Sequence, residues 1–195
     1  MTDDEIVTWA DRYSVGGGYS CSTTELTQLL SLAKRVPDGG SICEIGVLYG
    51  RSSTVWFLEQ ERRRESGHPP FDLHLVDSWV LNEGDTRPAF EWLMEQLGFP
   101  PFTPHWKPSQ QAVDEIPMLD LLFIDGDHTG GAWDDSRLYL PKVKVGGVVV
   151  YHDYGDPVDY PEVQKAVDAC IRANLLGRWE PLPLVDRLFM AVRAE

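Results

Sequence analysis

The chain has 195 residues, of which 17 are basic and 31 acidic, so its formal net charge at pH 7 is −14. A chain of this length suits a single domain, and its negative charge opposes the phosphate backbone of nucleic acids, which we exclude as partners. No stretch approaches the roughly 18 consecutive apolar residues of a membrane span. The three cysteines lack metal-ligand spacing, so we expect a protein of the reducing cytoplasm that contacts no membrane.

The N-terminal part of the chain is expected to be a helical cap, residues 1–36, on a core formed by residues 37–195. Apolar spacing indicates a short first helix, and Ser22 followed three residues later by Glu25 is typical of the start of a second helix. Three consecutive glycines, at positions 16–18, separate the two helices. They form either a lid over a ligand or a plain linker.

A buried strand is predicted at residues 41–45, and a turn with Gly46 and Gly50 follows it. Glycine lets the backbone approach a ligand, and the helix that begins near Ser52 offers unpaired N–H groups there. Glu44, at the end of the strand, repels phosphate but suits a positively charged amino group. An acid at this place, without the pattern G-x-G-x-x-G, argues against a dinucleotide site and a nicotinamide oxidoreductase.

A second strand is expected at residues 71–76 and ends in Asp77. An acid in this position can accept hydrogen bonds from both hydroxyls of a ribose, as in nucleoside-binding α/β folds. The alternative is a turn or helix-cap residue. An aromatic-rich segment with a helix at 87–97 follows, then a short strand at 105–107 and a helix that opens at Ser109.

Two further apolar runs each end in ionisable side chains. The first, residues 119–124, ends in Asp125, Asp127 and His128, and the second, residues 148–151, ends in His152 and Asp153. Because the carboxyl ends of parallel strands meet at one edge of an open α/β sheet, we expect these carboxylates and imidazoles to lie together. Such a cluster suits a hard cation such as Mg²⁺, a proton transfer, or both.

Strands and helices alternate along the chain, which ends in a helix at 161–175 and two strands at 179–184 and 187–192. This alternation predicts an α/β fold. The final pair of strands predicts one antiparallel strand near the end of a mainly parallel sheet.

With these features, the chain resembles a class I S-adenosylmethionine-dependent methyltransferase. More narrowly, the chain is similar to the small-molecule group of macrocin O-methyltransferase-like and cephalosporin-hydroxylase-like proteins, and more distantly to catechol O-methyltransferase. The match runs from about Ser41 to Tyr154 and rests on Glu44-Ile45-Gly46 with Gly50, on Asp77, on Ser109-Gln110, on Phe123 to His128, and on Gly146-Gly147 leading to His152-Asp153-Tyr154. The resemblance implies a Rossmann-like, doubly wound seven-stranded sheet with a C-terminal antiparallel hairpin.

The resemblance also implies S-adenosylmethionine as cofactor, Mg²⁺ as metal, and a role for each matching residue. At the methionine end of the cofactor, Gly46 and Gly50 would line the site, with Glu44 and Ser52 beside them. Asp77 would hold the ribose, and Ser109 and Gln110 would flank the adenine. Asp125 would also contact the cofactor. The metal ligands would come from Asp125, Asp127, His152 and Asp153. His128 would be the general base, with Asp125 as its catalytic partner. The chain departs from the pattern at Gly130-Gly131, at Asp134-Asp135 and at Tyr154.

The expected reaction is O-methylation of a small metabolite, such as a sugar or a polyketide- or peptide-derived natural product. The pocket for this acceptor would be shaped by Tyr19, Trp79 and Trp106. One alternative is a glycosyltransferase that holds a nucleotide sugar through Asp125-Gly126-Asp127 and a divalent ion, and another is a non-catalytic protein that binds S-adenosylmethionine. Exposed aromatic residues near both ends favour a homodimer.

Overall fold

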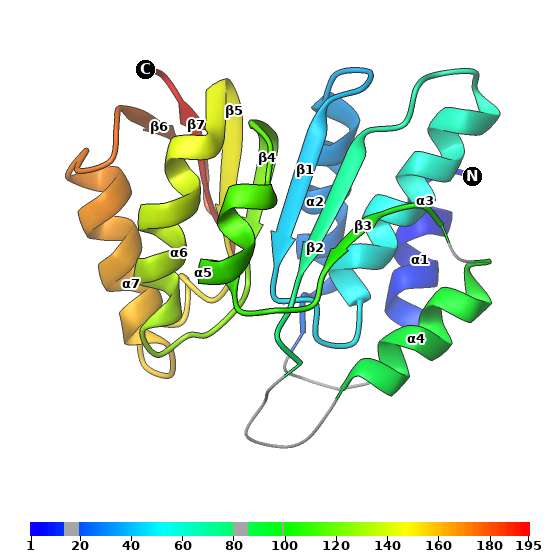
Figure 1. Cartoon of the computed structure of the whole chain (residues 1–195), viewed down its shortest axis with the longest axis horizontal. Helices are drawn as coiled ribbons and strands as arrows, with labels where there is room; N and C mark the ends of the chain where they lie inside the picture. The colour runs from blue at the N-terminus through cyan, green and yellow to red at the C-terminus, as the bar shows by residue number, and fades with distance from the viewer. Residues whose placement is uncertain (14–19, 80–85, 99) are drawn as a thin grey trace.

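The computed structural model describes residues 1–13, 20–79, 86–98 and 100–195 (Figure 1). The segment with the glycine run at 16–18 and Tyr19, for which a lid and a plain linker are the alternatives, lies outside these residues. Among the helices that are described, none is long and apolar enough to cross a membrane.

Within the described residues, one sheet holds seven strands in the order β3-β2-β1-β4-β5-β7-β6. The strands are β1 (Ser41–Ile45), β2 (Asp72–Val76), β3 (Thr103–His105), β4 (Leu119–Ile124), β5 (Val143–Tyr151), β6 (Trp179–Pro181) and β7 (Phe189–Arg193). Strands β1 to β5 pair in parallel, and β7 is antiparallel to both of its neighbours. This topology confirms the predicted α/β fold with a reversed strand near its end.

Helices cover both faces of the sheet (Figure 1). They are α1 (Asp3–Tyr13), α2 (Thr23–Arg35), α3 (Arg51–Glu65), α4 (Arg87–Gln96), α5 (Ser109–Ala112), α6 (Gly131–Tyr139) and α7 (Pro161–Val167). Short 3-10 turns follow α5 and α6, at Val113–Glu115 and Leu140–Lys142. The predicted last helix is α-helical only to Val167 and continues as a π-helical segment, Asp168–Arg172.

Two hydrophobic cores lie on opposite faces of the sheet, because successive side chains of a strand point to opposite sides. In β1, Ile42 packs with residues of α1 to α4, whereas Cys43 and Ile45 pack with residues of α5 to α7. All five residues of β1 are buried. Burial on both faces explains why the central strands read as continuous apolar runs.

The loops after β1 and β4 touch each other at the carboxyl edge of the sheet. Gly46 has a φ of +90°, and a Cβ there would lie 2.1 Å from the carbonyl oxygen of Asp125. Only glycine fits this conformation and this spacing. The contact joins the predicted cofactor turn directly to the acidic tip of β4.

Candidate active site

Asp125, His152 and Asp153 stand at the carboxyl ends of the neighbouring strands β4 and β5. Backbone hydrogen bonds extend the sheet into these residues, from the N–H of Asp125 to Ile45 (2.8 Å) and from the N–H of His152 to Ile124 (3.1 Å). Their positions are therefore fixed by the sheet itself. The expectation that the ionisable tips of the two strands meet is confirmed.

Two histidines bridge the two aspartates. His152 Nδ1 lies 3.1 Å from Asp125 Oδ1 and 3.1 Å from Asp153 Oδ2. His128 Nε2 lies 3.1 Å from Asp153 Oδ2 and 3.4 Å from Asp125 Oδ1. Burial opposes the charge of each group, but the mutual attraction is stronger: it lowers the pKa of Asp125 to about 2 and raises the pKa of both histidines.

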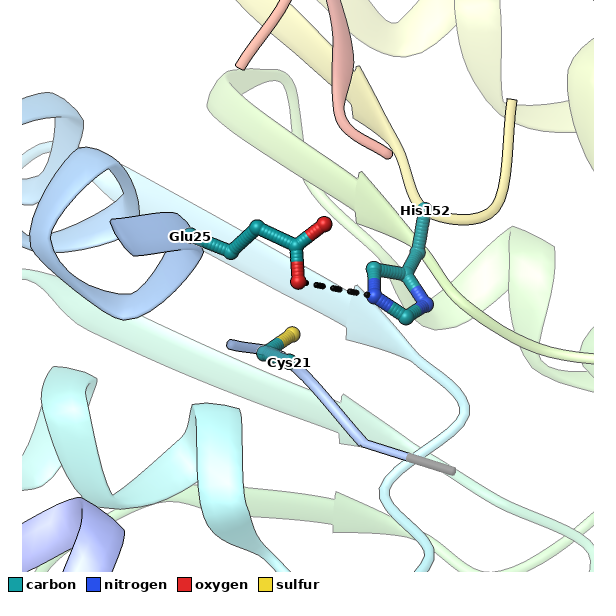
Figure 2. Close-up of side chains that lie close together, drawn as sticks. All are labelled: Cys21, Glu25 and His152. Carbon is teal, nitrogen blue, oxygen red and sulfur yellow. Dashed lines mark hydrogen bonds and ion pairs between the residues drawn. The ribbon is translucent and has the colours of Figure 1, made fainter. Parts of the chain in front are cut away.

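Glu25 and Arg187 complete this network, and neither was predicted from the sequence as a site residue. Glu25, in the first turn of α2, is fully buried, and its Oε2 lies 3.4 Å from His152 Nε2 (Figure 2). The Arg187 side chain donates to Asp153 Oδ1 (2.8 Å), and its backbone N–H donates to Glu25 Oε1 (2.9 Å). Three carboxylates thus face three basic side chains, so their formal charges cancel when both histidines are protonated.

Asp153 holds an unusual backbone conformation. Its φ is +59°, in the left-handed region that costs a residue with a Cβ about 1–2 kcal/mol. The conformation persists because the side chain is anchored at both oxygens, by Arg187 on one and by the two histidines on the other. Strain of this kind is typical of functional sites.

Asp127 lies outside this cluster, so the geometry gives no support to its predicted role as a metal ligand. Its carboxylate accepts hydrogen bonds from the N–H (2.9 Å) and the hydroxyl (2.6 Å) of Thr129, and from the N–H of Gly131 (3.2 Å). These bonds shape the turn that leads into α6. Asp127 is therefore a turn and helix-start residue, the alternative role that aspartate commonly fills.

Glu44 and Ser52 face each other inside the protein rather than a ligand. Glu44 is fully buried, and its carboxyl group accepts hydrogen bonds from the hydroxyls of Ser52 and Ser53 and from the indole N–H of Trp56. Burial raises the pKa of Glu44 to about 8. Glu44 lies beneath the turn, as expected, and its bonds fix the start of α3; the contact of Glu44 and Ser52 with the cofactor stays a prediction.

The space beside both glycines of the turn is occupied by the protein. At Gly50, whose φ is +80°, a Cβ would lie 2.8 Å from side-chain atoms of Leu93 and Phe90 in α4. At Gly46 the neighbour is the loop after β4, as described above. The two glycines are needed for these contacts, and their predicted approach to the cofactor stays a prediction.

Asp77 is partly exposed and holds the same turn from the other side. Its Oδ2 accepts from the N–H groups of Val47 (2.8 Å) and Leu48 (3.0 Å), and its Oδ1 accepts from the N–H of Trp79 (2.7 Å). The side chain therefore lies between the turn after β1 and the segment after β2.

Ser109 and Gln110 stand at the start of α5, on the far side of β4. The Ser109 hydroxyl donates to Asp135, a buried residue of α6 whose pKa burial raises to about 6. Gln110 is exposed. Of the two predicted adenine neighbours, Ser109 therefore presents its hydroxyl to the protein, and Gln110 has a free surface.

Trp79 and Trp106, two of the predicted pocket residues, pack against each other. Their ring centres lie 4.9 Å apart, and both rings contact Phe90 of α4. Trp79 is buried. The two tryptophans form an aromatic wall beside the carboxyl ends of β2 and β3, and Tyr19 lies outside the described residues.

Comparison with known proteins places the chain in a family. A family model described as a methyltransferase domain matches residues 43–154. Among curated proteins, an uncharacterised protein of Acanthamoeba polyphaga mimivirus, R132, is 37% identical over 71 residues. That alignment covers 35% of this chain and only 32% of the viral protein.

Solved structures share the fold at low sequence identity. The SAH-bound methyltransferase PaMTH1 of Podospora anserina superposes with a TM-score of 0.70 and 15% identity, covering 99% of this chain and 88% of that one. The O-methyltransferase NovP superposes with a TM-score of 0.65 and 20% identity, covering 89% of this chain and 81% of that one. CalS11, a TDP-rhamnose 3'-O-methyltransferase of calicheamicin biosynthesis, superposes with a TM-score of 0.61 and 15% identity, covering 97% of this chain and 93% of that one. The fold is that of class I methyltransferases.

Proposed function

We propose that the chain, which belongs to the methyltransferase domain family, transfers a methyl group from S-adenosylmethionine to a hydroxyl oxygen of a small metabolite, with Mg²⁺ held by Asp125 and Asp153. The observation that carries this proposal is the meeting of these two carboxylates with His128 at the carboxyl edge of the sheet. Relatives named for O-methylation, including CalS11 with its TDP-rhamnose acceptor, support a hydroxyl on a sugar or related natural product.

The edge beside β1 and β2 fits S-adenosylmethionine. The three N–H groups bound to Asp77 use three of the roughly four lone-pair directions of its carboxylate, which leaves one for a ribose hydroxyl. The turn after β1 runs beside this carboxylate into the start of α3. When bound, S-adenosylmethionine supplies the methyl group on a positively charged sulfur, and this charge suits an edge rich in carboxylates.

The donors between β4 and β5 fit Mg²⁺. Asp125 and Asp153 offer hard oxygen ligands, and Mg²⁺ keeps several waters beside one or two carboxylates. The Nε2 atom of His128 is buried and has no hydrogen-bond partner of good geometry among the residues described. When bound, the cation lowers the pKa of a coordinated hydroxyl and orients it.

His128 is placed to take up the proton of the acceptor. Burial lowers the pKa of His128, but the attraction of Asp125 and Asp153 outweighs burial and raises the pKa above its ordinary value. A cation held by the same carboxylates would weaken this attraction and would favour the neutral imidazole, which can accept a proton at Nε2. Tyr160, whose ring centre lies 4.8 Å from that of His128, holds the imidazole in place.

The test combines binding and turnover. S-adenosylmethionine is titrated calorimetrically into protein stripped of metal with EDTA, and again after Mg²⁺ is added; methyl transfer to a panel of sugar and phenolic hydroxyls is then measured under both conditions. We expect binding in both titrations and turnover only with Mg²⁺. An absence of binding to folded protein would refute the proposal, and binding without turnover on any acceptor would favour a non-catalytic protein.

A matched pair of variants separates the metal ligand from the turn residue. Asp153→Asn keeps the left-handed backbone, which asparagine tolerates, but removes a charged ligand, so Mg²⁺-dependent turnover should fall at least 100-fold. Asp127→Asn keeps the two bonds from Thr129 to Oδ1 and loses only the longer bond from the N–H of Gly131, so turnover should change little. Equal losses in the two variants would remove Asp153 from the metal site.

The glycosyltransferase alternative loses its motif in this structure. It requires both acids of Asp125-Gly126-Asp127 to face a diphosphate, and the carboxylate of Asp127 is turned into its own loop.

We propose that the methylation reaction takes place in the cytoplasm, where thiols stay reduced. The cysteines Cys21, Cys43 and Cys170 are all buried and form no disulfide.

A further inference from the structure

Cys21, Glu25 and His152 form a buried cluster beneath the active-site edge (Figure 2). Cys21 and Glu25 flank the start of α2, and His152 follows β5. Their exposed fractions are 3%, 0% and 2%, and one potential ligand atom from each lies within 4.8 Å of the other two. The methyl transfer proposed above uses neither Cys21 nor the Nε2 face of His152.

We propose that these three side chains bind a borderline divalent ion of the Zn²⁺ type. Thiolate sulfur, imidazole nitrogen and carboxylate oxygen are the ligands that Zn²⁺ takes in proteins, whereas Mg²⁺ takes oxygen. Bonds of about 2.0–2.1 Å at a tetrahedral angle put two ligand atoms roughly 3.3–3.4 Å apart. The distance between His152 Nε2 and Glu25 Oε2 is 3.4 Å, which matches the separation expected for two ligands of one zinc ion. The same distance is long for a hydrogen bond.

Glu25 and His152 are both oriented by outer partners, as metal ligands are. His152 Nδ1 lies 3.1 Å from the carboxylates of Asp125 and Asp153, which leaves Nε2 to face Glu25. The carboxylate of Glu25 accepts from the N–H of Ser22 (2.6 Å) and of Arg187 (2.9 Å) and keeps lone pairs for an ion. A carboxylate behind the distal nitrogen of a histidine is the usual support of a zinc-bound imidazole.

Charge balance favours the ion at this position. The site would hold two anionic ligands, the Cys21 thiolate and the Glu25 carboxylate, and one neutral ligand, the imidazole of His152. Together the ligands offset the charge of +2 of the ion, and any proton that a ligand atom carries before binding passes to solvent. The fourth tetrahedral position is left for a water or for a carboxylate.

This inner site is closed, and it differs from the open edge at Asp125, whose side chain is 20% exposed. Its three ligand residues are all buried, and one of the four tetrahedral positions remains for a water or a carboxylate. The ion would join the N-terminal cap to the end of β5. The inference does not depend on the proposed methyl transfer, because its test reads the metal directly.

The test is a titration of metal-free, reduced protein with Co²⁺ in the presence of excess Mg²⁺, which occupies oxygen sites. We expect a thiolate-to-cobalt charge-transfer absorption that saturates at one equivalent and is abolished by one equivalent of Zn²⁺. Cys21→Ser should remove the absorption and weaken Zn²⁺ binding at least 10-fold, with the fold verified by circular dichroism. Cys170→Ser, the same change at another buried cysteine, should leave both unchanged.

Two results would overturn the proposal. The first is wild-type protein without a charge-transfer band after a stoichiometric addition of Co²⁺, a measurement that needs no variant to fold. The second is a band of equal intensity in Cys21→Ser, which would assign the thiolate to another cysteine.

Discussion

Replacing Glu44 with glutamine is expected to remove a pH-dependent loss of stability. Glu44 is fully buried beneath α3, and burial raises its pKa from 4.5 to about 8, so the folded protein resists ionisation of this group. In the unfolded chain the same carboxyl ionises freely. The folded state therefore holds one more proton than the unfolded state over the range between these two pKa values.

The sign and size of the effect follow from linkage. Because the folded pKa is the higher one, the stabilising contribution of Glu44 is complete below pH 4.5 and is lost as the pH rises to about 8. The loss is about 1.4 kcal/mol per pH unit in this interval. Between pH 5 and pH 7 the wild-type chain should lose about 2–3 kcal/mol of unfolding free energy through this one group.

Glutamine suits the site because it reproduces the protonated carboxyl. Its oxygen can accept from Ser53 and Trp56, as Glu44 Oε2 does, and its amide can donate to the hydroxyl of Ser52, which is able to accept. Glu44→Ala, by contrast, leaves three donors without their acceptor and creates a cavity. It should destabilise the protein at every pH.

The assay is urea unfolding of wild type and Glu44→Gln at pH 5, 6 and 7, with the unfolding free energy taken from midpoint and slope. Other titrating groups are common to both proteins, so the difference between them isolates Glu44. We expect the variant to gain about 2–3 kcal/mol relative to wild type from pH 5 to pH 7. A difference that stays constant with pH would show that Glu44 is ionised in the folded protein and would refute the reasoning.

Two further predictions concern the turn after β1. Asp77→Ala should weaken S-adenosylmethionine binding by about 1.5–3 kcal/mol, through the lost ribose acceptor and a loosened turn, as measured by calorimetry; an unchanged dissociation constant would contradict the ribose assignment. Gly46→Ala should lower the unfolding free energy by more than about 3 kcal/mol, because its Cβ meets a carbonyl oxygen at 2.1 Å. Gly39→Ala is the control, since Gly39 also has a positive φ, +68°, but nothing within 4 Å, so it should cost only about 1–2 kcal/mol. Equal losses in the two glycine variants would contradict the steric argument.

The architecture and the acidic edge were predictable because their signals are local. Apolar runs of strand length, each ending in an ionisable residue, predict both the strand and the place where it stops. Asp125, His152 and Asp153 could therefore be brought together from the sequence alone. The helices were predictable from the same kind of local pattern, and the predicted helices differ from the observed ones mainly at their ends.

The roles of single side chains were less predictable where a partner lies far away in the sequence. Glu25 reads as a helix-capping residue, and it does cap α2, but the same carboxylate also reaches His152 and Arg187. Ser109 donates to Asp135, a pairing across two helices for which the sequence gives no signal. Asp127 is the opposite case, since its competing turn role is set by Thr129, two residues away.

The hydrogen bond between Arg187 and Glu25 joins residues 162 positions apart. Closing so long a loop is entropically costly unless the intervening chain is already ordered, so we expect this contact to form late in folding. During synthesis the N-terminal cap and the first strands leave the ribosome early, yet Glu25 and Asp153 stay without Arg187 until the last hairpin emerges. We therefore expect the edge with Asp125, His152 and Asp153 to form last, and a nascent chain that stalls before residue 187 to carry the turn after β1 without the contacts that Arg187 makes to Glu25 and Asp153.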